Sequence, residues 1–271
     1  MAAASVNHWP QSKCAKAFWS QQQLGPYRRL LADTAAWLDP QPGERWLDLG
    51  SGSGQLVRAL WEKSGGTLTE LAALDCARAN ERSVRQLRAA LQPPPGDRLR
   101  FCHADFSAGL AGWGDGQLDG ISSGLAIQYA EWYSPERGCW TTDAYDRLLA
   151  EVYRVLRPGG RFVFSVNVPN PSWSIVALWA LPGLLFAPGL TRVLKNCLRM
   201  WTYGRWLKRE ARSGRFHYLA AETIEAKLRA VGFAAVEFRR SFAGQAYVFR
   251  CRKPAAGATL RGLTPPAPEA A

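Results

Sequence analysis

The sequence predicts an α/β fold in which a mostly parallel β-sheet is covered by helices on both faces. Short apolar segments alternate with segments of helical period over most of the 271 residues, and the turns between them are short. Alternation of this kind is typical of parallel sheets built from β-α-β units. Hydrophobic residues make up 47% of the chain, which is enough for one well-packed domain.

The chain begins with residues 1–23, which we interpret as a helical lead-in to the domain. This segment is polar with interspersed aromatic residues and lacks the basic and apolar regions of a secretory signal. Residues 24–39 carry apolar positions at helical spacing and stop before Pro40, as a helix should. The domain is therefore expected to start at residue 24.

Seven segments have the composition of β-strands, and four further helices are expected between and after them. The helix at 81–92 ends at the prolines that follow it, and Pro158-Gly159-Gly160 closes another. The expected strands are 45–50, 71–75, 99–106, 118–127, 161–168, 234–241 and 246–252. The expected helices are 53–64, 81–92, 143–156 and 220–233.

The regular alternation stops after the fifth expected strand. Residues 170–215 form an insertion that is apolar at first and basic afterwards. The final segment, 254–271, is rich in proline and alanine, and we expect it to be disordered. The domain is therefore expected to span residues 24–253, with the insertion as an added element.

The charge and the cysteines restrict the partners and the compartment. A formal net charge of +12 predicts an anionic partner, which could be a nucleic acid, a membrane surface or an acidic substrate. The six cysteines are scattered without a C-x-x-C pair. This pattern argues against a metal site and against a disulfide framework, and it favours a reducing cytoplasm.

The most informative motif is the glycine loop that follows the first expected strand and leads into a helix. Its glycines let the backbone approach a ligand at a helix N-terminus, which dinucleotides and S-adenosylmethionine both exploit. The dinucleotide pattern G-x-G-x-x-G would need a third small residue at position 55, which is Gln55. Asp48 would face a pyrophosphate unfavourably but suits the cationic sulfonium and ammonium of S-adenosylmethionine. The loop residues expected to contact this cofactor are Asp48, Gly50, Ser51, Gly52 and Gly54.

Two further carboxylates end the next two strands. Asp75 could accept both ribose hydroxyls, and Asp105, beside the backbone of Phe106, could accept the adenine amino group. Each aspartate alone is equally well explained as a helix N-cap. Because three of them end successive strands after a G-x-G-x-G loop, we favour the cofactor.

With these residues in place, the sequence resembles the class I S-adenosylmethionine-dependent methyltransferases. The resemblance rests on LDLGSGSG, the strand end at Asp75, HADF and LLAEVYRVLRPGGRFVFSV, and it covers about residues 24–168 and 216–250. Within that family the chain is similar to small-molecule enzymes, including those that methylate quinones on carbon. The resemblance implies a Rossmann-like, seven-stranded sheet. It also implies methionine contacts at Gly50 and Gly52, a ribose contact at Asp75, and adenine contacts at Cys76, Asp105 and Phe106. The stretch Ser123–Gln128, with Ser123 and Gln128 as contacts, would pass the transferable methyl group.

The catalytic machinery is less defined by the sequence. Methyl transfer from a sulfonium mainly requires alignment of the two substrates, and a base is needed only if the acceptor loses a proton. Candidate bases in segments expected above the C-terminal edge of the sheet are Tyr129, Glu131, His217 and Tyr218. The alternative for each is a packing aromatic or a surface hydrogen bond.

Nucleic-acid acceptors are disfavoured by the motifs. A D/N-P-P-[YFW] tetrad is expected after the fourth strand of enzymes that methylate amino groups of DNA or RNA, whereas Ser122–Leu125 stands there. No cysteine follows a proline as in the cytosine-C5 enzymes, and the paired glutamates expected for an arginine acceptor are missing. A hydrophobic or amphiphilic small molecule is therefore the expected acceptor, with an RNA or protein methyltransferase as the alternative and a fold without turnover as a third.

The insertion admits several interpretations. Residues 162–191 carry no charge, and 192–215 hold eight basic residues against Glu210. An apolar, tryptophan-bearing face with basic flanks is typical of a helix in an anionic membrane interface. The apolar pieces, broken at Pro182-Gly183, are too short to span a bilayer. Peripheral membrane contact through 173–209, a soluble substrate lid and a basic RNA patch all remain open.

Overall fold

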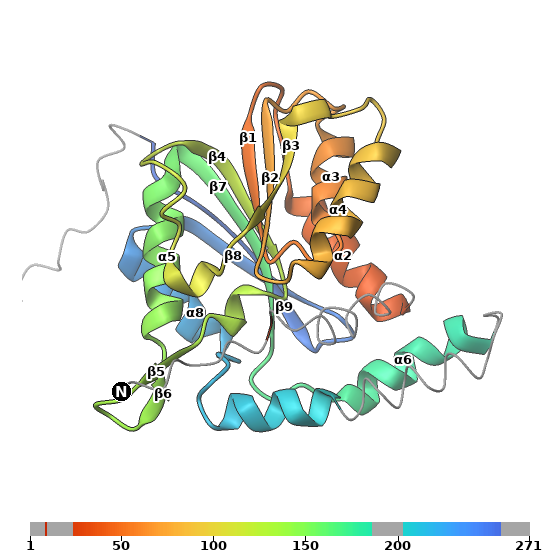
Figure 1. Cartoon of the computed structure of the whole chain (residues 1–271). Helices are drawn as coiled ribbons and strands as arrows, with labels where there is room; N and C mark the ends of the chain where they lie inside the picture. Colours follow the sequence, from red (N-terminus) through yellow and green to blue (C-terminus); the bar gives the residue numbers. More distant parts are fainter. Residues whose placement is uncertain (1–8, 10–23, 186–202, 256–271) are drawn as a thin grey trace, which may run out of the picture.

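The computed structural model describes residues 9, 24–185 and 203–255. Its central feature is a seven-stranded sheet of order β3-β2-β1-β4-β7-β9-β8 (Figure 1). Neighbouring strands from β3 to β7 are parallel, whereas β9 runs antiparallel to both β7 and β8. The predicted α/β class and the mostly parallel Rossmann-like sheet are confirmed.

The observed elements match the expected alternation. The sheet strands are β1 Arg45–Leu49, β2 Glu70–Asp75, β3 Leu99–His103, β4 Leu118–Gly124, β7 Leu156–Asn167, β8 Ala234–Ser241 and β9 Ala246–Arg252. The main helices are α2 Gly25–Trp37, α3 Gln55–Lys63, α4 Ala79–Ala90, α5 Asp143–Val155 and α8 Ala221–Val231. Apolar side chains of the parallel strands divide between two apolar clusters, one on each face of the sheet. In β2, for example, Leu71 packs on the α3 and α4 side and Ala72 on the α5 and α8 side. The parallel part of the sheet is thus buried on both faces, as parallel sheets require, whereas most residues of the edge strand β8 are exposed or half-buried.

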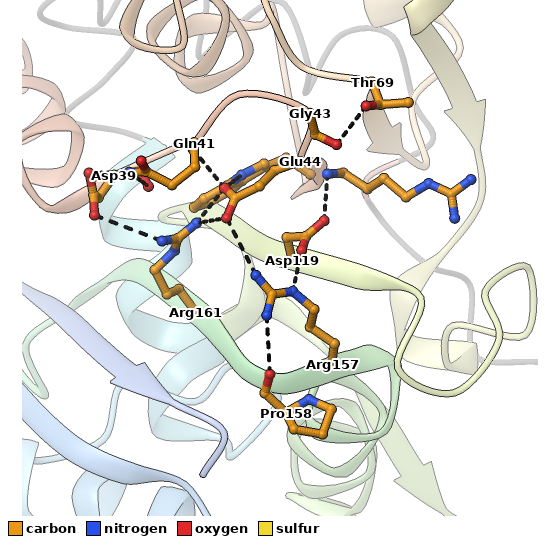
Figure 2. A network of polar contacts seen from close by, with 11 residues as sticks. Asp39, Gln41, Gly43, Glu44, Thr69, Asp119, Arg157, Pro158 and Arg161 are labelled. Carbon is orange, nitrogen blue, oxygen red and sulfur yellow. Dashed lines mark hydrogen bonds and ion pairs between the residues drawn. The ribbon is translucent and has the colours of Figure 1, made fainter. Parts of the chain in front are cut away.

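A network of charged side chains joins the strands at the edge of the sheet where β1, β4 and β7 begin (Figure 2). Glu44 is buried, accepts a hydrogen bond from Trp46 Nε1 at 2.9 Å and pairs with Arg161. Asp119 accepts from the backbone nitrogen of Arg45 at 2.8 Å and pairs with Arg157. These ion pairs and hydrogen bonds compensate the burial of Glu44, and they lie at the opposite edge from the pocket described below.

Two expected strands are shorter than predicted. The strand expected at 99–106 ends at His103, because the Asp105 side chain accepts from Ser107 N and starts a 3-10 turn at Phe106–Ala108. The strand expected at 118–127 ends at Gly124, because Leu125 has a φ of +51° and a second turn follows at Ile127–Tyr129. Composition alone could not show that the apolar residues after these strands belong to turns.

A small hairpin was not predicted. Strands β5 Trp132–Ser134 and β6 Cys139–Thr141 pair antiparallel between the second turn and α5. Each strand has three residues, too few for an alternating pattern to be recognised in the sequence.

The insertion contributes helices at the edge of the sheet where β7 ends (Figure 1). Helix α6, Trp173–Leu185, includes Pro182-Gly183, so the predicted break there is wrong. A proline removes one backbone hydrogen bond, and the other residues of α6 keep a helical backbone. Residues 203–212 are also helical. No helix within the described residues is both long and apolar enough to cross a bilayer. Most of residues 1–23 and 254–271, whose states were predicted, lie outside the described residues.

Candidate active site

A pocket lies at the edge of the sheet where β1, β2 and β4 end. The glycine loop and the β2–α4 connection line one part of it, and helix α2 and the β4–α5 connection line another. The side chains of Asp48, Asp75 and Asp105 all face this pocket. Because the carboxyl ends of parallel strands meet at one edge, the topology brings together three residues that are far apart in the chain.

The glycine loop is held against β2 and presents its backbone to the pocket. Ser51 N donates to Leu74 O at 2.9 Å, and Gly50 and Gly52 have φ values of +67° and +52°. The Ser51 hydroxyl is buried without a hydrogen-bond partner among the described residues. A Cβ atom at Gly52 would meet no atom within 4 Å. A free hydroxyl and open space beside the loop are what a bound ligand would use.

Asp75 connects the glycine loop to the start of α4. One carboxylate oxygen accepts from Gly52 N and the other from Ala77 N, both at 2.8 Å. Burial raises the pKa of Asp75, and the two backbone hydrogen bonds and the Asn80 side chain oppose that shift. A carboxylate has about four lone-pair positions, so Asp75, with these three donors, can still accept a hydroxyl group of a ligand.

Asp48 is a buried carboxyl beneath the same loop. Its side chain accepts from Ser122 Oγ at 2.7 Å, and the residue is 2% exposed. Burial raises the pKa of Asp48 to about 7, the Ser122 hydrogen bond lowers it, and the nearby charge of Asp75 raises it further. A cation in the pocket would favour the ionised form, so cation binding and proton release are coupled at this carboxyl.

The remaining predicted residues at this end of the pocket are Cys76, Asp105 and Phe106. All three line it. Burial raises the pKa of the Cys76 thiol, with Asp75 and Asp105 adding to the shift, so the thiol stays neutral. The Asp105 side chain accepts from Ser107 N at 2.9 Å, so the N-cap interpretation and the pocket position both apply to this residue.

Three residues predicted to contact the cofactor do not line the pocket. Gly54, with a φ of +87°, caps α3, and a Cβ there would lie 2.6 Å from Leu87. Ser123 is fully buried and donates to Leu49 O at 2.8 Å. Gln128 is also fully buried, and its Oε1 accepts from Asn167 N at 2.6 Å. Gly54, Ser123 and Gln128 therefore support the walls of the pocket from behind.

The four candidate bases occupy different environments. Tyr129 lines the pocket, and its hydroxyl lies 3.2 Å from that of Tyr218, which does not line it. His217 is buried, with Nε2 2.8 Å from Ala130 O, and burial lowers its pKa. Glu131 is buried in an ion pair with Arg215. His217 and Glu131 are thus engaged by the protein itself, and only Tyr129 among the four faces the ligand space.

Sequence reasoning missed the contribution of helix α2. Tyr27, Leu30 and Leu31 line the pocket, and Leu30 packs with Val176 of α6 and Phe242 near β9. The helical period of 24–39 was recognisable, but Val176 and Phe242, which pack against Leu30, lie more than 140 residues away. Asn80, which also lines the pocket and bonds to Asp75, could have been suggested by its place just after the Asp75 strand end.

Comparisons with known proteins agree with this arrangement. Residues 47–164 match the family described as "Methyltransferase domain". The chain is 29% identical over 217 residues to the demethylmenaquinone methyltransferase of Clavibacter sepedonicus, covering 80% of this chain and 76% of the relative. It is 30% identical over 170 residues to a ubiquinone/menaquinone biosynthesis C-methyltransferase of Acidiphilium cryptum, covering 58% and 59% of the two chains.

The chain is a class I S-adenosylmethionine-dependent methyltransferase. Its fold is shared with an S-adenosylmethionine-dependent methyltransferase from Mesorhizobium loti, with a TM-score of 0.52, 21% identity, and coverage of 82% of this chain and 96% of the other. S-adenosylmethionine is accordingly the cofactor of this methyltransferase. When bound, it supplies a methyl group carried on a positively charged sulfur.

The residues of the pocket fit that cofactor. Its lining, among the described residues, includes three aspartates and no Lys, Arg or His. Negative side chains suit a ligand with a sulfonium and an ammonium, and their oxygen atoms suit one that offers hydroxyl and amino donors. Asp48 would hold the cationic end beside Gly50 and Gly52, Asp75 the ribose, and Asp105 the adenine. The chain's own part in the reaction is then to position the two substrates and exclude water.

Proposed function

We propose that this methyltransferase transfers the methyl group to a hydrophobic or amphiphilic small molecule, such as a prenylated quinone precursor or a lipid-like acceptor. The observation that carries the proposal is the composition of the pocket wall away from the aspartates. Leu30 and Leu31 of α2 meet Leu125 and the aromatic rings of Trp9 and Tyr129 there. An apolar wall of this kind favours a ligand with little charge.

The absence of cationic side chains from the described lining supports the same conclusion. A phosphorylated or carboxylated acceptor would need a positive partner in a site this buried. Among the described residues, the basic side chains that contribute to the +12 charge lie outside this lining. The two curated relatives, named for quinone biosynthesis, are consistent with a ring-bearing apolar acceptor.

The experiment that tests this function is transfer of a radiolabelled methyl group from S-adenosylmethionine. Purified protein would be incubated separately with a membrane lipid extract, with total RNA and with a protein fraction. We expect label in material extractable by organic solvent, since the pocket favours apolar molecules. Label only in the RNA or protein samples would contradict the proposal and support the alternative methyltransferase class.

The apolar acceptor is proposed to reach the pocket from an anionic membrane surface, which helix α6 would contact. Val176 faces the protein and is buried, whereas Ile175, Leu178 and Trp179 are 39%, 63% and 67% exposed. A helix that is apolar on all sides is normally buried on all sides. The outer face of α6 therefore needs an apolar partner.

The positive charge of the neighbouring helix, residues 203–212, supports an anionic membrane as that apolar partner. Arg205, Arg209 and Arg212 are exposed at helical spacing on residues 203–212, while Leu207 of the same segment is buried. Trp173 Nε1 of α6 donates to Gly204 O at 3.1 Å, which ties the two helices together. An apolar face beside a basic face matches the headgroup and acyl layers of an anionic bilayer. A soluble lid, the alternative, would need no basic face.

Vesicle binding of a Leu178→Ser/Trp179→Ser variant tests this membrane contact. Wild type should co-sediment with phosphatidylcholine vesicles that contain phosphatidylglycerol. The variant should bind about tenfold or more weakly, because two exposed apolar side chains are lost at about 25 cal/mol per Å². Phe238→Ser, which removes an exposed aromatic residue on β8, is the matched control and should bind like wild type. If wild type does not co-sediment with anionic vesicles, the membrane contact is refuted and the soluble lid is supported.

A further inference from the structure

Three polar side chains form a cluster at the apolar wall of the pocket. Tyr129 comes from the turn after β4, Asn167 from the end of β7 and Tyr218 from the segment before α8. The two phenol oxygens lie 3.2 Å apart, and the Asn167 side chain lowers the pKa of both phenols. Tyr129 and Tyr218 are 7% exposed and Asn167 is 1% exposed. Polar groups this buried are expected to have defined hydrogen-bond roles.

The donors in this cluster outnumber the contacts that use them. Each phenol keeps one proton, because burial raises the pKa of both hydroxyls. The contact between the phenols uses one of these two protons. The Oδ1 atom of Asn167 takes neither, because it has no hydrogen-bond partner among the described residues. One phenol proton is therefore left to form a hydrogen bond with another acceptor.

The ligand space is the place where that acceptor can lie. Of the three side chains only Tyr129 lines the pocket within the described part of the chain. Its ring packs on Trp9, also in the lining, with centroids 4.4 Å apart. Burial raises the pKa of Tyr129 to about 12, so the phenol keeps its proton at neutral pH. It can donate a hydrogen bond, but it is a poor base in the free enzyme.

We propose that Tyr129 donates a hydrogen bond to an oxygen of the methyl acceptor, and that Tyr218 and Asn167 are positioning residues for Tyr129. The ligand class is an aromatic or enol-type ring with a hydroxyl or carbonyl group, its ring against Trp9. This inference rests on the proposed function, since it concerns the same apolar acceptor. The buried donor would make the enzyme prefer rings that carry the oxygen, because a ring without it leaves the donor unpaired.

The test compares two probes of similar shape, 2-naphthol and 2-methylnaphthalene, by calorimetry in the presence of S-adenosylhomocysteine. We expect Tyr129→Phe to lower the ratio of 2-naphthol affinity to 2-methylnaphthalene affinity about fivefold to tenfold, the effect of one buried hydrogen bond. Tyr218→Phe should lower the ratio less, about twofold to threefold, because Tyr129 keeps its proton. Using the ratio cancels the difference in hydrophobicity between the probes.

Tyr145→Phe is the matched control. Tyr145 is a fully buried phenol of α5 whose hydroxyl has no hydrogen-bond partner among the described residues, and it does not line the pocket. Its substitution should leave the ratio unchanged. An unchanged ratio in Tyr129→Phe, with both probes bound, would overturn the role of Tyr129 and leave the proposed function intact. If neither probe binds wild type while S-adenosylhomocysteine does, the apolar acceptor and this inference both fail.

Discussion

Asp75→Ala is expected to weaken S-adenosylhomocysteine binding by about 100-fold or more. The carboxylate holds Gly52 N and Ala77 N at 2.8 Å, and it is also the group assigned to the ribose. Alanine would remove the acceptor of both backbone donors together with that of the ligand hydroxyls. Hydrogen bonds to a charged group contribute about 1.5–3 kcal/mol each, so the loss of two corresponds to at least a hundredfold. Calorimetric titration with S-adenosylhomocysteine measures it directly.

The controls separate the loss of a ligand contact from general damage. Asp75→Asn keeps one acceptor oxygen but turns an amide donor towards a backbone N–H, so its affinity should also fall, by about tenfold. Asp115→Ala removes an exposed carboxylate, 80% accessible, that pairs with Arg154 far from the pocket. It should bind like wild type. Circular dichroism would verify that each variant is folded, and a folded Asp75→Ala protein with wild-type affinity would refute the ribose assignment.

The part of this site that sequence could predict is the part fixed by strand ends. Asp48, Asp75 and Asp105 come at or just after the ends of three parallel strands, and such ends converge at one edge whatever the details of packing. The same argument located Gly50 and Gly52, because a loop between a strand and a helix must turn there. The topology alone therefore predicts the cofactor end of the pocket, and the structure places all five residues in its lining.

The acceptor end was less predictable because turns and long-range packing build it. Leu125 adopts a φ of +51° and the turn at Ile127–Tyr129 follows, so strand alternation does not set the side-chain directions after Gly124. Gln128 consequently points away from the pocket and Tyr129 towards it. The position of α2 depends on contacts with α6 and β9, and no local pattern specifies which distant segments will meet. The cluster of Tyr129, Asn167 and Tyr218 likewise depends on the end of β7 meeting two segments that lie far from it in the sequence.

The composition of the insertion could be read from the sequence, whereas its structure could not. Its apolar and basic halves were evident from composition, and the structure separates them onto two helices. The predicted break at Pro182-Gly183 is wrong, because a proline removes only one backbone hydrogen bond and neighbouring residues can keep helical geometry. Which residues of α6 face outward could not be predicted, since nearly every position from 173 to 186 is apolar and the sequence offers no polar face.

Gly50→Ala should destabilise the protein and abolish tight cofactor binding, whereas Gly52→Ala should mainly affect binding. At Gly50 the new Cβ would lie 2.3 Å from Ala126 Cβ, and φ is +67°. Overpacking of this kind costs about 1–3 kcal/mol, and the left-handed backbone adds about 1–2 kcal/mol. At Gly52 the Cβ would meet nothing within 4 Å, so only the backbone cost remains. Urea denaturation without ligand measures the stability difference, and calorimetry with S-adenosylhomocysteine measures binding.

A second substitution distinguishes the clash at Gly50 from the strain of its backbone. Ala126→Gly in the Gly50→Ala background removes the atom that the new Cβ would meet, so it should restore the overpacking part of the stability, about 1–3 kcal/mol. The left-handed strain would persist, since φ at position 50 is unchanged. Ala126→Gly alone should be slightly destabilising, because glycine loses more backbone entropy on folding. If the double variant is no more stable than Gly50→Ala, the close approach of the glycine loop to the β4–α5 connection is not what requires glycine at position 50.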